Sequence, residues 1–466
     1  MIKFLRVLAL IVPAQLLVII MLGNIRLPAI IADNMVLQQN SRVSLWGWAD
    51  PKEKVTVTAS WNNTPVVAIA DASGRWKLSM ATSKAGGPYR LQFAGTNSIE
   101  INNVLLGEVW LASGQSNMEF FMKKMGGGYT GVLNYEEEIK AADYPLIRSI
   151  DIPNKVADEP QKDFSGAWKV CSPQTADTFS AVAYYFARSV FKATGYPVGI
   201  INATWGGTPA ESWTKKEVLA ADSSFKVILD RYNKQCEEYP VAFEKYKQAL
   251  EKWRADTAAS KPPAPREPMG PHHSNSPYKL YNGMIAPVLP YTIKGCIWYQ
   301  GEANAGRAAQ YQRLFPAMIN SWRAEFHNKN MPFYFVQISP HRSQHPEIRE
   351  AQFYTLRHVP HTGMVVTTDN GDSLDIHPRN KQLVGERLAL WPLKYDYGKK
   401  NLVASGPLYK AMKKEGNKIR IYFEEADGLV FKGNKAAEFT IASADQHFVP
   451  AMASIEGNTI LVWSDA

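Results

Sequence analysis

Ser116 is the residue whose surroundings first suggest covalent chemistry. It follows an apolar run over residues 104–112 and comes two residues after Gly114, a pattern typical of a strand that turns sharply into a helix. A serine hydroxyl attacks a carbonyl carbon when it is exposed at such a turn, close to a base and to N–H donors. The alternative is that Ser116 only caps the helix that we expect over residues 118–125.

Two later loops supply groups that suit an oxyanion site. Residues 202–213 begin at the end of a predicted strand and contain Gly206 and Gly207, where the absence of a side chain lets a backbone N–H approach a ligand. Residues 296–304 contain Gln300, whose amide can donate a hydrogen bond, and Glu302, whose carboxylate can orient a histidine. A plain tight turn and a structural loop remain the alternatives.

His377 is the histidine that is placed like a general base. It lies in the segment 369–378, which follows a predicted strand and precedes a predicted helix, with Asp375 two residues before it and Pro378 after it. His272, His273 and His345 lie in polar or proline-rich stretches, where we expect structural or solvated roles. His341 is a possible substrate contact.

The pattern along the chain predicts an α/β fold flanked by β structure. Short alternating runs separated by turn residues predict an antiparallel β domain over residues 24–105. Buried strands that alternate with helical stretches then predict a parallel sheet over 106–396. The expected strands are 104–112, 198–203, 295–299, 333–338 and 364–368, and the expected helices are 181–194, 307–326, 348–359 and 380–390.

Two further regions interrupt or follow this sheet. A charged helical stretch and a proline-rich stretch over about 215–275 predict an insertion at the rim of the sheet, where it could overhang the site. Alternating residues return over 397–466 and predict a second β region. Its last strand, 459–463, precedes only three residues, so we expect either an edge strand or a truncated region.

Composition limits the classes of function. The chain has 466 residues, 45% of them hydrophobic, and a formal charge of +9, which fits a globular protein of two or three domains. The basic residues are scattered among acidic ones, so we expect no nucleic-acid partner.

Cys171, Cys236 and Cys296 are widely spaced and allow at most one disulfide. We expect no metal site, because no His/carboxylate cluster has ligand spacing.

Residues 1–23 resemble an export signal. Lys3 and Arg6 precede an apolar stretch over 7–22, which matches a charged n-region and an apolar h-region. Pro13 interrupts the stretch and no Ala-x-Ala site follows. An uncleaved N-terminal anchor is therefore the alternative, and only in that case do we expect membrane association. The expected location is the periplasm or the outside of the cell.

The four loops, in this order and spacing, resemble the sequence blocks of the SGNH hydrolase superfamily, and closely those of its sialate O-acetylesterase (SASA-type) branch. The segments Gly-Gln-Ser-Asn-Met at 114–118 and Tyr-Gln-Gly-Glu-Ala-Asn at 299–304 carry the resemblance, and residues 27–39 are similar to the family's N-terminal β domain. The resemblance implies a three-layer α/β/α sheet with a β-sandwich-like N-terminal domain. It also implies a serine esterase without cofactor that removes acetyl groups from sugars, chiefly the 9-O-acetyl group of sialic acids. Family members usually continue past this C-terminus.

The resemblance also assigns roles to matching residues. Ser116 becomes the nucleophile and His377 the general base. The oxyanion donors become the backbone N–H of Ser116, that of Gly207 with Gly206 as the alternative, and the Gln300 side chain. The substrate contacts that we expect are Gln115, Asn117, Trp205 and Glu302.

The acid behind the base is left open. Superfamily members commonly place aspartate three residues before the histidine, where this chain has Leu374. Asp375 and Glu302 are both candidates, and the third possibility is a Ser–His pair steadied by a backbone carbonyl.

Two other functions fit the sequence less well. An esterase acting on acetylxylan or another glycan would keep the chemistry and change the sugar. A glycan-binding protein on a decayed esterase scaffold would use the chain's many aromatic side chains for stacking. This second reading is disfavoured, because nucleophile, base and donors are all present in the sequence. The expected partner is thus an O-acetylated sugar or sialoglycan.

Overall fold

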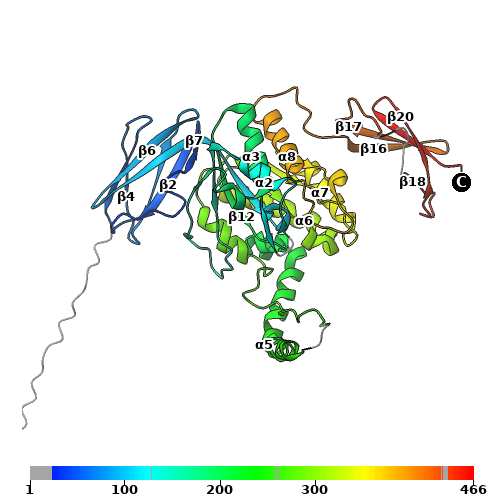
Figure 1. Ribbon diagram of the computed structural model, residues 1–466, viewed down its shortest axis with the longest axis horizontal. Coiled ribbons are helices and arrows are strands. Elements are labelled where there is room, and N and C mark those ends of the chain that lie inside the picture. The colour runs from blue at the N-terminus through cyan, green and yellow to red at the C-terminus, as the bar shows by residue number, and fades with distance from the viewer. Residues whose placement is uncertain are drawn as a thin grey trace, which may run out of the picture.

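The computed structural model describes residues 24–126, 129–257, 260, 262–431, 433 and 439–465. Three parts follow one another along the longest axis: a β domain, a central α/β region and a C-terminal β region (Figure 1). The predicted signal over residues 1–23 lies outside the described residues. None of the described helices is both long enough and apolar enough to cross a bilayer.

The centre of the molecule is a largely parallel sheet, which confirms the predicted fold class. Its strand order is β11-β10-β12-β7-β13-β14-β15. The strands are β7 (Ser98–Gly114), β10 (Tyr144–Asp151), β11 (Lys169–Cys171), β12 (Val198–Thr204), β13 (Gly295–Tyr299), β14 (Phe333–Val336) and β15 (Thr362–Val365). Only β11 runs antiparallel to its neighbour in this row. The five expected strands are present, whereas β10 and β11 were not predicted.

Helices cover the sheet on both faces. The main ones are α3 (Ala181–Thr194), α6 (Ala308–Glu325), α7 (Glu347–His358) and α8 (Lys381–Tyr395), close to the expected bounds. Helix α3 packs against α8, and α6 packs against α7. Trp110 meets Phe186 of α3 with ring centroids 5.1 Å apart, and Trp298 meets Trp322 of α6 at 5.7 Å. These buried rings fill the two layers of the core.

A single strand joins the N-terminal β domain to the central parallel sheet. The domain contains β1 (Val36–Gln38), β2 (Arg42–Trp48), β3 (Lys54–Ala59), β4 (Val66–Ile69), β5 (Arg75–Ala81) and β6 (Gly86–Ala94). The first part of β7 pairs with β6, and its last seven residues pair with β12 and β13. The predicted domain boundary at 105/106 therefore falls inside one continuous strand.

The helix expected over residues 118–125 is wrong. Helix α1 spans only Ser116–Glu119, and β8 (Lys124–Gly126), β9 (Tyr129–Thr130) and α2 (Tyr135–Lys140) follow. The carbonyls of Met118 and Phe120 accept from the Ser180 hydroxyl and the Ala181 N–H, at the start of α3. Because these carbonyls are bonded elsewhere, the helix does not propagate.

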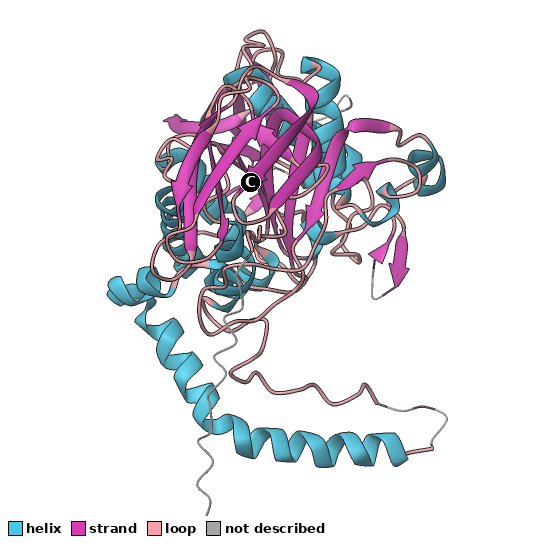
Figure 2. Cartoon of the chain, turned by 90° about the vertical axis from the view of Figure 1, so that its left-hand side faces the viewer, coloured by secondary structure: helices cyan, strands magenta, loops and turns pink. Residues whose placement is uncertain are grey.

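The insertion consists of α4 (Lys216–Ala221) and the long α5 (Lys226–Ala255), followed by an extended proline-rich segment. Figure 2 shows α5 projecting away from the body of the molecule with a bend along its length. Pro240 lies inside this helix, and a proline there removes a backbone hydrogen bond and bends the axis.

The C-terminal region is a separate four-stranded sheet in the order β16-β17-β21-β20. Its strands are β16 (Leu408–Glu415), β17 (Lys418–Glu424), β20 (Met452–Glu456) and β21 (Thr459–Trp463), and the pair β18 (Thr440–Ile441) and β19 (Val449–Pro450) lies beside them in sequence. The expectation of an edge strand at 459–463 is wrong, because β21 pairs with β17 on one side and β20 on the other. The one disulfide that the sequence allowed is not formed, since all three cysteines are free thiols.

Candidate active site

Ser116 lies directly beyond the carboxyl end of β7, at the centre of the sheet. Gly114 turns the chain there with φ of 139°, and a Cβ at this position would sit 2.2 Å from the Tyr299 carbonyl oxygen. Only glycine fits so close to the neighbouring strand. Ser116 then becomes the first residue of α1.

His377 meets Ser116 from the loop between β15 and α8. Its Nε2 lies 2.9 Å from the Ser116 Oγ. The imidazole packs beside Phe120 and Tyr129, with centroid distances of 6.4 and 5.9 Å. Burial, and next the positive charge of Lys381, lower the pKa of His377, while Asp375 opposes this shift. The imidazole is therefore mainly neutral near pH 7, which is the form that accepts a proton.

Asp375 lies near the base but does not hydrogen-bond to its ring. Its Oδ1 is 4.0 Å from His377 Nδ1, and it accepts the backbone N–H of His377 at 2.9 Å. Its side chain is 46% exposed. Glu302, the competing acid, is buried and accepts from Asn117 instead. Within the described ranges, no carboxylate oxygen lies within hydrogen-bond distance of His377 Nδ1.

Of the expected oxyanion donors, the backbone N–H groups of Ser116 and Gly207 remain candidates. Ser116 begins α1, so its N–H has no partner inside the helix. Gly207 has φ of 74° and open space where a Cβ would be. The alternative, Gly206, donates its N–H to the Glu119 carboxylate at 2.7 Å, so that N–H is already used.

The structure corrects the expectation for Gln300. This side chain is fully buried, and its Nε2 donates to Asn304 Oδ1 at 2.7 Å and to the Thr208 carbonyl at 3.2 Å. An amide nitrogen has two hydrogens, and both are taken. Gln300 therefore joins two loops and has no hydrogen left for an oxyanion.

Three of the four expected substrate contacts are also corrected. Gln115, Asn117 and Glu302 are buried, and their side chains bond to protein groups from neighbouring loops. A side chain enclosed in this way does not reach a sugar. Trp205 is half-buried, and its backbone N–H donates to the Gly114 carbonyl. The role of its side chain as a substrate contact stays a prediction.

Sequence reasoning missed two residues beside this site, Glu119 and Lys381. Glu119 accepts from the Gly206 N–H and from the Tyr129 hydroxyl, the latter at 2.5 Å. These bonds hold the glycine loop, which contains Gly206 and Gly207, beside Ser116. Lys381 is fully buried at the first position of α8. A lysine is electrostatically unfavourable at a helix N-terminus, and that misplacement was the signal available in the sequence.

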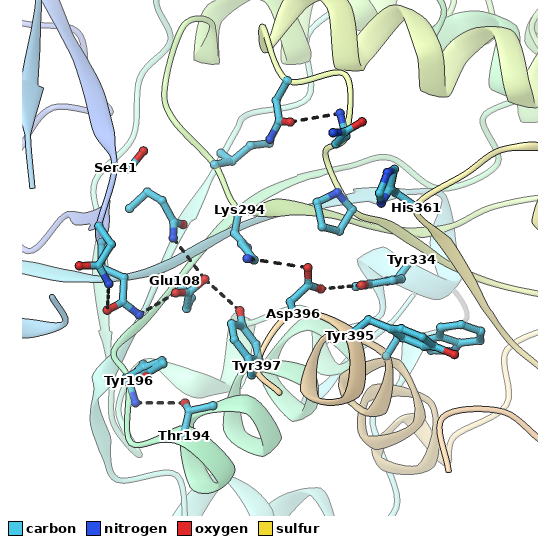
Figure 3. A pocket seen from close by; sticks show the side chains of 18 of the residues that line it. Ser41, Glu108, Thr194, Tyr196, Lys294, Tyr334, His361, Tyr395, Asp396 and Tyr397 are labelled. Carbon is cyan, nitrogen blue, oxygen red and sulfur yellow. Dashed lines mark hydrogen bonds and ion pairs between the residues drawn. The ribbon is translucent and has the colours of Figure 1, made fainter. Parts of the chain in front are cut away.

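A large cavity lies at the opposite edge of the sheet. Its volume is about 1100 Å³, and it opens where the parallel strands begin (Figure 3). Glu108 accepts from Tyr397, Gln38 and Gln39 there, and Asp396 accepts from Tyr334 at 2.5 Å. The carboxylates of this cavity are thus paired within the protein. A smaller cavity of about 210 Å³, lined in part by His341 and Ser373, lies beside the loop that carries His377.

The arrangement around Ser116 suits acyl transfer. A hydroxyl in contact with a neutral imidazole can be deprotonated as it attacks a carbonyl carbon. The backbone N–H of Ser116, and that of Gly207 in the loop after β12, are the candidate donors to the charge that forms on the carbonyl oxygen. The hydroxyl, the imidazole and the candidate N–H donors thus lie in segments that follow the carboxyl ends of β7, β15 and β12.

Comparisons with known proteins agree with this chemistry. Residues 271–393 match the family described as carbohydrate esterase, sialic acid-specific acetylesterase. The rat (Rattus norvegicus) sialate O-acetylesterase is 30% identical over 90% of this chain and 83% of its own length, and the human (Homo sapiens) one is 29% identical over 90% and 80%. The crystal structure of a carbohydrate acetylesterase from Xanthomonas citri superposes with a TM-score of 0.78 and 33% identity, over 95% of this chain and 91% of that one. The chain therefore belongs to the sialate O-acetylesterase family of carbohydrate esterases and is a carboxylic ester hydrolase.

Proposed function

We propose that this enzyme removes O-acetyl groups from sugars through an acetyl-enzyme on Ser116, and that sialic acids acetylated at the 9-hydroxyl are its substrates. The observation that carries the proposal is the 2.9 Å contact between Ser116 Oγ and His377 Nε2 at the carboxyl edge of the sheet. The acetyl ester and the sugar follow from the names of its relatives.

The first half of the reaction transfers the acetyl group to the enzyme. His377 Nε2 takes the Ser116 proton while Oγ attacks the acetyl carbonyl carbon. The resulting oxyanion accepts hydrogen bonds from the N–H groups of Ser116 and Gly207. The carbon–oxygen bond to the sugar then breaks, and His377 gives its proton to the departing sugar oxygen.

The second half returns the free enzyme. A water molecule gives its proton to His377 Nε2 and attacks the acetyl carbonyl carbon of acetyl-Ser116. The same two N–H groups donate hydrogen bonds to the second oxyanion. Release of acetate returns the proton from His377 to Ser116 Oγ.

Ser116→Ala tests this proposal, and Ser113→Ala is its matched control. Ser113 lies three residues before Ser116, and its side chain is fully buried. We expect Ser116→Ala to lose release of p-nitrophenol from p-nitrophenyl acetate with an unchanged circular dichroism spectrum, while Ser113→Ala keeps turnover. Turnover retained in Ser116→Ala would remove Ser116 from the mechanism.

Acetate release from two acetylated carbohydrates tests which sugar the enzyme acts on. We expect faster release from O-acetylated sialic acid than from acetylated xylan. The reverse order would assign the enzyme to xylan. Binding to either glycan without acetate release would instead favour a glycan-binding protein.

We also propose that the chain is exported, because residues 1–23 have the charge and hydropathy pattern of a signal. The mass of the mature protein from the native host tests this. Loss of the first residues is expected for a cleaved signal, and an intact N-terminus in the membrane fraction would identify an anchor.

A further inference from the structure

Asn117 links the neighbours of the nucleophile and the base. It directly follows Ser116 in the chain. Its Nδ2 donates at 3.0 Å to the carbonyl of Ile376, the residue that precedes His377. One side chain thus ties the backbone at the serine to the backbone at the histidine, across 259 residues of sequence.

Two buried groups of opposite charge fix the orientation of this amide. Lys381 Nζ donates to Asn117 Oδ1 at 2.5 Å, and Glu302 Oε1 accepts from Asn117 Nδ2 at 2.7 Å. An ammonium group only donates and a carboxylate only accepts, so the oxygen and nitrogen of the amide cannot exchange places. The exposed fractions of Lys381, Asn117 and Glu302 are 0%, 1% and 8%.

Lys381 is enclosed by protein groups and has no contact with solvent. Its Nζ lies 4.6 Å from the centroid of the Phe120 ring and 5.5 Å from that of Tyr299. Burial lowers the pKa of Lys381 to about 7, although Glu302 and Asp375 oppose the shift. Burial likewise raises the pKa of Glu302. Two buried ionisable groups are costly to keep unless they are compensated, and Asn117 lies between them.

We propose that Asn117, oriented by Lys381 and Glu302, is the positioning residue that sets the distance between Ser116 Oγ and His377 Nε2. Asp375 does not hold the ring in this way, because its Oδ1 is 4.0 Å from Nδ1. The proposal rests on the function proposed for Ser116 and His377. Asn117 contacts neither substrate nor reacting atoms in this account.

Lys381 has a second effect on the base, through its charge. The charged and titratable groups that face His377 are Lys381, Asp375 and His341, with the Tyr129 ring packed beside it. Lys381 and His341 disfavour the imidazolium, whereas Asp375 favours it. Removal of Lys381 is therefore expected to raise the pKa of His377.

Kinetics of Asn117→Ala and Lys381→Met test the positioning role. A misplacement of about 1 Å costs about 100-fold in rate, so we expect Asn117→Ala to lower kcat by about that factor with KM within about threefold of wild type. We expect Lys381→Met to lower kcat and also to move the acidic limb of the kcat/KM profile to higher pH. Because both act through one amide, the double variant is expected to lose less than the product of the two single losses.

Lys294→Met is the matched control. Lys294 is also paired with a carboxylate, Asp396 at 3.8 Å, but at the opposite edge of the sheet. We expect it to keep wild-type kcat and pH profile. Labelling of Ser116 by a fluorophosphonate gives the concentration of intact sites, so that lost folding is separated from lost rate.

The kinetics of these variants can contradict the positioning role of Asn117 in separate ways. A kcat for Asn117→Ala within threefold of wild type, or a raised KM with unchanged kcat, would overturn the positioning role. If the two losses of kcat multiply in the double variant, Asn117 and Lys381 do not act through one amide. If Ser116→Ala, measured in parallel, keeps turnover, the proposed function itself fails, whereas an inactive Ser116→Ala beside a normal Asn117→Ala rejects only this inference.

Discussion

Ser116 Oγ and His377 Nε2 lie 2.9 Å apart although 261 residues separate them in the chain. The contact forms because β7 and β15 belong to one sheet and both end at its carboxyl edge. Catalytic loops of parallel sheets gather at that edge.

The acidic limb of the pH profile reports the base. Burial, reinforced by Lys381, lowers the pKa of His377 from its ordinary value of 6.5, so the neutral imidazole persists to lower pH. We expect kcat/KM to fall only as pH drops below 6.5, with an apparent pKa under that value. The profile of p-nitrophenyl acetate hydrolysis measures it, and an apparent pKa above 7 would contradict the buried environment.

Asp375→Asn measures how far a carboxylate assists the base. In a triad with a buried, hydrogen-bonded aspartate this change costs about 10⁴ in kcat. Here Oδ1 is 4.0 Å from Nδ1 and the side chain is half-exposed, and asparagine can still accept the His377 N–H. We expect a loss of about tenfold or less in kcat. A loss near that of Ser116→Ala would show that Asp375 closes onto the ring during the reaction.

Gly206→Ala tests the crowding beside the nucleophile. A Cβ at Gly206 would lie 2.8 Å from the Tyr129 hydroxyl oxygen and 3.4 Å from the Ser116 Cβ. We expect kcat to fall at least about tenfold, because Tyr129 and the glycine loop must shift. Gly406→Ala is the control, since no atom lies within 4 Å of a Cβ there. Equal kcat in both variants would show that the loop adapts freely.

Gln300→Ala distinguishes a structural amide from an oxyanion donor. Loss of an oxyanion donor costs about 10² to 10³ in kcat. Because both Nε2 hydrogens of Gln300 are bonded to Asn304 and Thr208, we expect kcat per folded molecule to change less than about threefold. The free energy of unfolding should instead fall by about 1–3 kcal/mol, as buried partners lose their bonds. A large loss of kcat at unchanged stability would restore Gln300 to the oxyanion site.

Sequence patterns predicted the fold where burial alone determines structure. The strands β12 and β13 are buried along their whole length, and such apolar runs between helices are recognisable without a structure. Strand β10 was not predicted, because Pro145 and Arg148 interrupt its apolar pattern. Arg148 is nevertheless buried and is hydrogen-bonded to Asn34 and Asn103.

The candidate site divides in the same way. Ser116 and His377 follow from local patterns at strand ends and from the family resemblance. The bonds of Asn117 to Glu302 and Lys381 span 185 and 264 residues, and no local pattern encodes such contacts. The same holds for Gln300, because only the fold shows that its two amide hydrogens are taken by Asn304 and Thr208.

Rapid-quench mass spectrometry of the enzyme mixed with p-nitrophenyl acetate tests most directly whether Ser116 carries an acetyl group during turnover. We expect one added acetyl group on the peptide that contains Ser116, which appears within the first turnover and disappears when substrate is exhausted. Ser116→Ala should show none. Acetylation of another residue at the rate of turnover, or steady turnover by Ser116→Ala, would contradict the account.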